Sequence, residues 1–263
     1  KMCIWSTGLV MNFVGLGPGF QAQAFIPNTL VTSNLTGNFI PSTGINTNFW
    51  DNQVGGGKNI RRFNGITHNN SAPHNFQFDG SNDYLGEAAD GYGGDPFYVD
   101  GGNAFTLAQW YKHKNNTRHV AFGLTYSGGD VIILWTGQRI LNQMTLEDGG
   151  GGRADFTNFT FANNTWYYIA VVHHGSNQFS FFVNGALIGT GSVNATDNTG
   201  STGSAADTLQ IGKTAGSNYT QANMKVGHVH VHSAALTASK IRQNYLATHE
   251  PRSTLLYGAN FTA

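Results

Sequence analysis

Three histidines alternate with valines near the C-terminal end of the chain. His228, His230 and His232 are separated by single residues, so in a strand they share one face, roughly 7 Å apart along it. That spacing lets two imidazoles reach one transition-metal ion, and a histidine row can also form a pH-sensitive interface. The sequence nominates no fourth ligand, and the alternative is a solvated or interface face of an outer strand.

Oxygen-bearing side chains gather in one predicted turn. Asp79, Asn82 and Asp83 surround a Gly-Ser pair. Because Ca²⁺ takes roughly six to eight oxygen ligands, this turn is a candidate calcium site. The alternative is that the same side chains hydrogen-bond the turn backbone, as Asx-turns do. The sequence alone establishes no cofactor, and Ca²⁺ is the candidate.

Some aromatic residues lie outside any clear strand pattern. Trp5, Trp50 and Tyr92 are of this kind, whereas most other tryptophans lie in apolar alternating runs and are expected in the core. An aromatic ring outside the core can stack on a sugar or bury itself in a partner protein. We therefore name these three as candidate ligand-binding residues.

The composition excludes several classes of protein. The net charge is zero and only 11% of the 263 residues are charged, so no basic surface for nucleic acid is expected. Glycines and Pro18 interrupt the apolar stretch 4–20, and we expect no membrane insertion. The single cysteine, Cys3, allows no intrachain disulfide.

Alternating apolar patterns predict a chain made mainly of strands. The Asn184-Gly185 pair between two such patterns predicts a tight hairpin. A single helix is expected over 236–246, with Thr237 as its N-cap. The predicted strands are Leu9–Phe13, Phe76–Phe78, Phe105–Trp110, Val131–Trp135, Trp166–Val172, Phe179–Val183, Ala186–Ile188, Leu209–Gly212 and Val226–His232.

Several of these segments resemble one known family when taken in order. Phe76–Leu85 reads FQFDGSNDYL, Phe105–Trp110 reads FTLAQW, and Trp166–Val172 reads WYYIAVV. Val229–Thr237 reads VHVHSAALT and is followed by Ile241–Tyr245, IRQNY. Together they resemble concanavalin A-like, laminin-G-like jelly-roll domains, in the form common in bacteriophage virion and bacterial surface proteins.

The resemblance implies an all-β fold, a two-sheet antiparallel β-sandwich (jelly roll) with one short C-terminal helix. Ligand or partner contacts would lie on its concave face or rim loops. We expect a single domain over residues 1–263, with core motifs at 76–247. A long irregular segment, 14–75, would wrap the domain, and 248–263 would be a C-terminal tail.

Hydrolases on this fold use two carboxylates roughly 5 Å apart, one as nucleophile and one as acid/base. Glu87, Glu147 and Glu250 are each isolated in the sequence, and no predicted strand carries two glutamates on one face. The sequence therefore predicts that the chain is not an enzyme.

Two functions follow from these expectations. The first is a structural or adhesive virion protein, of capsid-decoration or tail-fibre type, that also binds glycans. It would be found on a virion or outside the cell, with other virion or surface proteins and copies of itself as partners. The alternative is a secreted or cell-surface carbohydrate-binding lectin module, with calcium-dependent binding.

Overall fold

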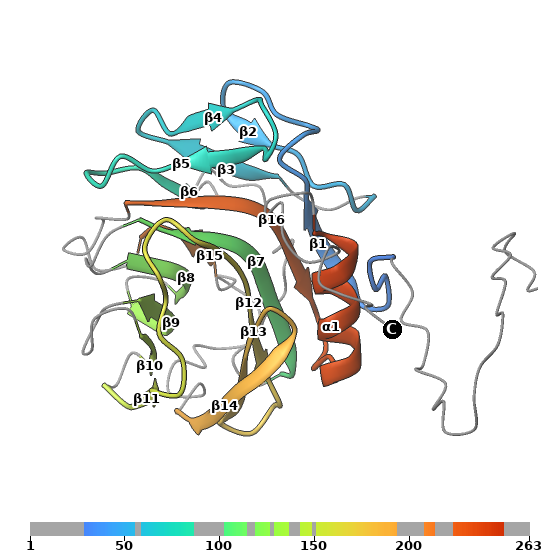
Figure 1. The fold of residues 1–263 in the computed structure, drawn as a ribbon, viewed down its shortest axis with the longest axis vertical. Helices are drawn as coiled ribbons and strands as arrows, with labels where there is room; N and C mark the ends of the chain where they lie inside the picture. Colours follow the sequence, from blue (N-terminus) through green and yellow to red (C-terminus); the bar gives the residue numbers. More distant parts are fainter. Residues whose placement is uncertain are drawn as a thin grey trace, which may run out of the picture.

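A computed structural model describes residues 29–55, 59–86, 103–114, 119–126, 129–136, 143–148, 151–193, 208–213 and 223–249. Two antiparallel sheets pack face to face, and one helix lies outside one of them (Figure 1). The predicted all-β sandwich with a helix near the C-terminus is confirmed. The predicted strand Leu9–Phe13 lies outside the described residues.

The first sheet, sheet A, carries the strongest alternating patterns of the sequence, and its long strands stand side by side at its centre. An edge strand, β1, Leu35–Phe39, pairs with β16 beside the main path. In spatial order the other strands are β14 (Ala186–Ser192), β13 (Gln178–Val183), β12 (Trp166–His173), β7 (Phe105–His113), β16 (Met224–His232), β5 (Asn75–Gln77) and β4 (Thr67–Asn69).

The second sheet, sheet B, collects strands from more distant parts of the chain. Neighbours such as β8 and β15 are far apart in sequence, so no hairpin turn joins them and long-range packing brings them together. In spatial order the strands are β11 (Arg153–Phe156), β10 (Met144–Asp148), β9 (Gly129–Thr136), β8 (His119–Tyr126), β15 (Thr208–Ile211), β6 (Tyr84–Gly86), β3 (Ile60–Phe63) and β2 (Phe49–Trp50).

The predicted Asn-Gly hairpin joins β13 to β14. Asn184 and Gly185 both have positive φ, 49° and 77°, which is the conformation that a tight hairpin turn of this type requires. The Asn184 side chain also accepts a hydrogen bond of 2.9 Å from the Tyr168 backbone N–H. The turn is therefore tied to the neighbouring strand β12 as well.

The helix α1, Ala238–Ala247, begins where the sequence predicts. The side chain of Thr237 accepts a hydrogen bond from the Lys240 N–H and caps its first turn. Ile241 is buried against an apolar cluster on the outer face of sheet A that includes Trp110 and Tyr168. Figure 1 shows α1 beside β16 and β1, away from β8–β10. No helix in the described ranges is long and apolar enough to cross a membrane.

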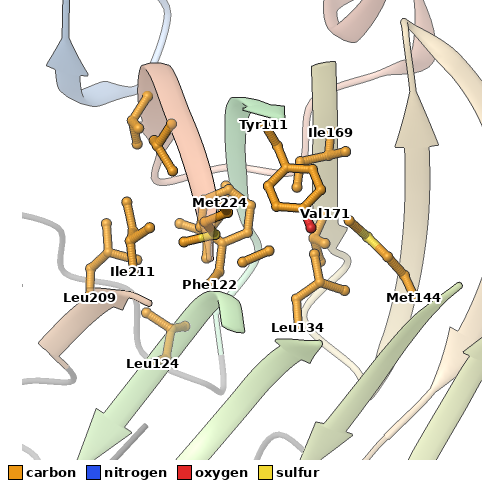
Figure 2. Packing of buried hydrophobic residues seen from close by; sticks show 14 of the residues in the cluster. Tyr111, Phe122, Leu124, Leu134, Met144, Ile169, Val171, Leu209, Ile211 and Met224 are labelled. Carbon is orange, nitrogen blue, oxygen red and sulfur yellow. The ribbon is translucent and has the colours of Figure 1, made fainter. Parts of the chain in front are cut away.

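The main core fills the space between the two sheets (Figure 2). Tyr111 and Val171 of sheet A meet Phe122 and Leu134 of sheet B, and all four side chains are buried. Complete burial of such a side chain stabilises the fold by about 1.5–3 kcal/mol. A void of about 10 Å³ remains beside Phe122, Leu134 and Val171; it is barely large enough for one water molecule. At this point between the sheets of the described structure, side chains therefore fill the space and leave no room for a ligand.

The prediction that residues 14–75 are irregular is wrong for their described part. Strands β1 to β4 lie within it, and Phe39, Trp50 and Ile60 from this part are buried in the main core. These strands are only two to five residues long, which is too short for an alternating pattern to stand out. They complete both sheets instead of wrapping around a finished domain.

Candidate functional site

The outer face of sheet B has a different character from that of sheet A. No described helix covers it, and side chains that alternate with core residues point outward from it. Strand register aligns one outward row across seven strands. From one edge to the other, this row is Arg61, Gly86, Gln210, Gly123, Ile133, Glu147 and Arg153.

A stacked aromatic pair lies next to the Arg61 end of this row. Phe63 of β3 is directly opposite Tyr84 of β6, and their rings are parallel within 7°, with centroids 4.2 Å apart. Both side chains are half-buried. Aromatic pairs in this arrangement are held beyond the effect of area burial alone. The pair is therefore a rigid apolar platform at the surface.

Two cationic side chains lie against this platform. The Arg61 guanidinium is 5.1 Å from the centre of the Phe63 ring, and the Lys213 ammonium is 4.4 Å from the centre of the Tyr84 ring. Both distances are within the range of cation–π attraction. Burial raises the pKa of Tyr84, and the charge of Arg61 opposes that rise. The phenol hydroxyl is therefore protonated at neutral pH and available as a hydrogen-bond donor.

Gln210 of β15 lies between two glycines of the same row. It pairs with Gly86 on one side and Gly123 on the other. A Cβ at position 86 would come within 3.4 Å of the Gln210 side chain and 3.6 Å of the Tyr84 ring. Such a Cβ would therefore be in ordinary van der Waals contact with both side chains. The side-chain carbonyl oxygen of Gln210 is buried without a hydrogen-bond partner.

The far end of the face combines apolar and charged groups. Val120, Ile133 and Trp135 form a small buried cluster. Beyond it, Arg153 donates to the Glu147 carboxylate at 2.8 Å. The hydrogen bond from Arg153 to Glu147, together with the negative charge of that residue, raises the arginine pKa. Arg153 thus has an acidic partner on this face, and two further cationic side chains, Arg61 and Lys213, lie at the aromatic end.

Chemically, this end of the face matches the surface of a sugar. A pyranose has apolar C–H faces that suit an aromatic ring and hydroxyls that suit an amide or a phenol. Tyr84 and Phe63 supply the rings, and Gln210 lies beside them with an amide whose buried oxygen has no hydrogen-bond partner. Arg61 and Lys213 add donors that can pair with hydroxyl or carboxylate oxygens.

The structure overturns Trp50 as a ligand-binding candidate. Its side chain is 0% exposed, and its ring lies 5.5 Å from that of Phe39 and 4.7 Å from that of Phe76. Its indole N–H donates to the Ile40 carbonyl at 3.0 Å. Trp50 is a core residue because β2 pairs with β3, and this pairing places the Trp50 side chain between the two sheets. Trp5 and Tyr92 lie outside the described residues.

The candidate calcium residues serve the turn backbone. The Asp79 carboxylate accepts from the Ser81 N–H at 2.7 Å, and the Asp83 carboxylate accepts from the Asp79 N–H at 3.0 Å. Asn82 is exposed. The second oxygen of Asp83 is buried without a hydrogen-bond partner, and burial raises the pKa of this carboxyl. The Asx-turn alternative describes this geometry, and calcium binding stays a prediction.

The three histidines do share one face of β16, with adjacent ring centroids 5.4 and 5.8 Å apart. The His228 ring is hydrogen-bonded to the Asn38 amide oxygen, and the His230 ring to the Tyr168 hydroxyl at 3.2 Å. Among the described residues, no group of three or more His, Cys, Asp or Glu is placed to hold a metal ion.

The expectation of a solvated or interface face on an outer strand is wrong about the strand and about the solvent. β16 lies between β7 and β5, and His230 and His232 are fully buried. Asn244 of α1 reaches the His232 ring. Burial and the neighbouring histidines hold the pKa of His230 well below its usual value. The row is therefore part of the contact that attaches α1 to sheet A.

Sequence reasoning missed most residues of the aromatic site. Arg61 and Phe63 fall in the segment expected to be irregular, and Tyr84 stands out in the sequence only as part of the FQFDGSNDYL motif. A usable signal was the Asn64-Gly65 pair after Phe63, both residues of which have positive φ. Such a pair marks the end of a short strand. No local signal links β3 to β15.

A family model described as the concanavalin A-like lectin/glucanases superfamily matches residues 79–242, more than half of the chain. The chain belongs to this superfamily. The predicted membership of the concanavalin A-like, laminin-G-like family is confirmed. The bacteriophage and bacterial-surface context is not shown. No curated protein matches the sequence.

Solved structures with the same fold are more distant. A Trypanosoma rangeli sialidase mutant with trans-sialidase activity has a TM-score of 0.65 at 17% identity, and the match covers 85% of this chain and 34% of that one. The same enzyme in complex with sialic acid has a TM-score of 0.63 at 17% identity, covering 85% and 34%. The binding domain of botulinum neurotoxin serotype D/C has a TM-score of 0.57 at 14% identity, covering 81% and 52%.

These neighbours correct two predictions. The prediction of a structural virion protein is wrong, because the solved structures that share this sandwich are described as sialidases and neurotoxin binding domains. The prediction that the chain is not an enzyme is also contradicted, because the same sandwich forms about a third of a sialidase chain. Isolated glutamates in a sequence do not separate enzyme-related from other members of one fold. Identities of 16–17% show the fold alone.

Proposed function

We propose that this chain is a secreted or cell-surface glycan-binding module that holds a sugar on the outer face of sheet B. The observation that supports the proposal is the stacked Phe63–Tyr84 pair flanked by Arg61 and Lys213. Aromatic rings beside polar and charged side chains on a sheet face are the elements of sugar recognition.

Membership of a lectin/glucanase superfamily agrees with this proposal. Among the structural neighbours, a sialidase is described in complex with sialic acid, and a neurotoxin fragment is described as a binding domain. This chain spans about a third of the sialidase chains. The proposal therefore concerns sugar binding by the sandwich alone. It is supported mainly by the aromatic and charged residues on the outer face of sheet B.

The test is a glycan array followed by titration calorimetry with the best array ligand. Replacing the platform ring, Tyr84→Ala, is expected to weaken binding about tenfold, the equivalent of one stacking contact. Tyr84→Phe keeps the ring and is the matched control, with a loss of about threefold or less because only the hydroxyl is removed. Circular dichroism checks that both variants fold.

The proposal is overturned if no glycan binds, or if Tyr84→Ala binds the array ligand as tightly as the unmodified chain. The array is run with calcium and again with a chelator. Loss of binding in the chelator, restored by calcium, would support the calcium dependence predicted for the Asp79–Asp83 turn. Formation of a homo-oligomer also stays a prediction, and light scattering of the same sample measures it.

A further inference from the structure

A second polar row crosses the outer face of sheet A, beyond the part that α1 covers. Lys112 of β7 lies directly opposite Lys225 of β16, with Trp166 of β12 on the other side of Lys112. Gln77 and then Thr67 continue the row across β5 and β4. Directly opposed residues have Cβ atoms roughly 5 Å apart, so the two lysines are close neighbours.

The two lysines repel each other, and the described structure offers them no acid. Like charges placed directly opposite on a sheet are destabilising. Across the described part of the chain, neither Lys112, Lys225 nor the nearby Lys114 makes an ion pair. The pKa of Lys225 is lowered, first by burial and then by the positive charges of Lys112 and Lys114. In a chain with only 14 lysines and arginines, this concentration stands out.

The neighbours of the lysines suit a sugar ring that carries an acidic group. Trp166 is half-buried against the apolar cluster under α1, so its position is constrained by packing. Gln77 and Thr67 add an amide and a hydroxyl to the same row. An aromatic ring beside two ammonium groups can contact the apolar face of a sugar while the ammonium groups pair with its carboxylate or sulfate.

We propose that this lysine row binds an acidic polysaccharide through its carboxylate or sulfate groups. The site lies on the opposite sheet from the Tyr84 platform and does not depend on it. An incoming anion relieves the repulsion between Lys112 and Lys225, which adds to its own attraction. Nucleic acid is a poorer fit, because the chain carries no net charge and the row is only a few residues across.

The experiment measures binding of the whole chain to four polymers: dextran sulfate, polygalacturonate, unsulfated dextran and a single-stranded oligonucleotide. We expect the two acidic polysaccharides to bind, increasingly weakly as salt is added, and dextran not to bind. The variant K112Q/K225Q should bind the acidic polysaccharides about tenfold more weakly. Binding of dextran sulfate alone assigns the site to sulfate, and binding of polygalacturonate alone assigns it to carboxylate.

The matched control is K240Q/R242Q, which removes the same charge from the exposed side of α1. It should change binding about twofold or less, because only long-range attraction is altered. Tyr84→Ala, which alters the proposed glycan face, is measured in parallel, and the loss of dextran sulfate binding should be larger in K112Q/K225Q than in Tyr84→Ala. Thermal melts give a second readout, in which K112Q/K225Q raises the midpoint of the free chain and removes the shift caused by dextran sulfate.

Three results would overturn the proposal. The first is equal loss of binding in the two double variants, which would indicate non-specific attraction. The second is tighter binding of the oligonucleotide than of either acidic polysaccharide. The third is no binding and no shift of the melting midpoint with either acidic polysaccharide.

Discussion

At the scale of single residues, the histidines of β16 show how burial sets a protonation state. The imidazole of His232 donates from Nδ1 to the Ser33 carbonyl and accepts at Nε2 from the Asn244 amide. The Asn244 oxygen is engaged by the Val31 N–H at 2.8 Å, so the amide cannot turn to offer an acceptor. A proton on Nε2 would face another donor, and the ring is therefore neutral in the folded chain.

Stability should decrease in acid because of this arrangement. Burial and the charge of Lys240 lower the pKa of His232 from 6.5 to about 4, against the opposing hydrogen bond to Ser33. Between pH 6.5 and about pH 4, the His232 ring is protonated in the unfolded chain but stays neutral in the folded chain. The free energy of unfolding from this residue is therefore constant above pH 6.5 and falls by about 3 kcal/mol towards pH 4. His230 acts in the same direction, whereas the raised pKa of Asp83 acts in the opposite one.

Urea unfolding at pH 7, 5.5 and 4.5 measures this effect in the unmodified chain, in His232→Gln and in His174→Gln. His174 is exposed and serves as the control. The difference in unfolding free energy between the unmodified chain and His232→Gln should shrink as the pH falls. A difference that is independent of pH would show that His232 does not contribute through its protonation.

At the scale of elements, the β13–β14 turn supports the helix. Gly185 has φ of +77°, and a Cβ there would lie 3.1 Å from the Arg242 backbone and 3.3 Å from the Tyr245 ring. Both of those residues belong to α1. The turn and the helix thus approach each other as closely as a glycine allows.

Gly185→Ala should therefore cost more than its backbone strain. A left-handed conformation costs a non-glycine residue about 1–2 kcal/mol, and the contact with α1 adds to that. Gly65→Ala is the matched control, because Gly65 has φ of +87° with no atom within 4 Å of the added Cβ. Chemical denaturation of both variants is compared with that of the unmodified chain. Equal losses in the two would show that α1 yields to the added methyl group.

At the scale of the whole molecule, the region before the family match belongs to the same core. Residues 79–242 match the superfamily, but Phe39, Trp50, Ile60 and Phe76 lie in the main core with residues of the matched part. Strands β1 and β5 both pair with β16. The sandwich is therefore continuous across that boundary.

A fragment limited to residues 79–242 is expected not to fold cooperatively, because it lacks strands of both sheets and these large core residues. A fragment covering 29–249 keeps all described elements and should unfold in a single transition. Differential scanning calorimetry of the two fragments, produced in the same way, makes the comparison. A sharp transition in the shorter fragment would mean that β1–β5 are an addition to a complete core.

Local sequence determined the elements whose signals lie within a few residues. Alternation over Trp166–Thr190 with Asn184-Gly185 predicted a three-stranded meander, and Thr237 with Ile241 predicted the capped helix. The ordered motifs also predicted the sandwich and its family. Each of these features depends on backbone propensity and on contacts between residues near in sequence, and both can be predicted from the amino-acid sequence.

Tertiary structure decided where those elements stand and hence which residues face a ligand. Trp50 is buried because β2 pairs with β3 and this pairing places its side chain in the main core. His230 and His232 are buried because β16 is a central strand of sheet A and α1 packs against it. The aromatic site requires β3, β6 and β15 in one register, although Phe63 and Lys213 are far apart in sequence. Burial and proximity of this kind result from long-range packing, and no residue's immediate neighbours in the chain encode them.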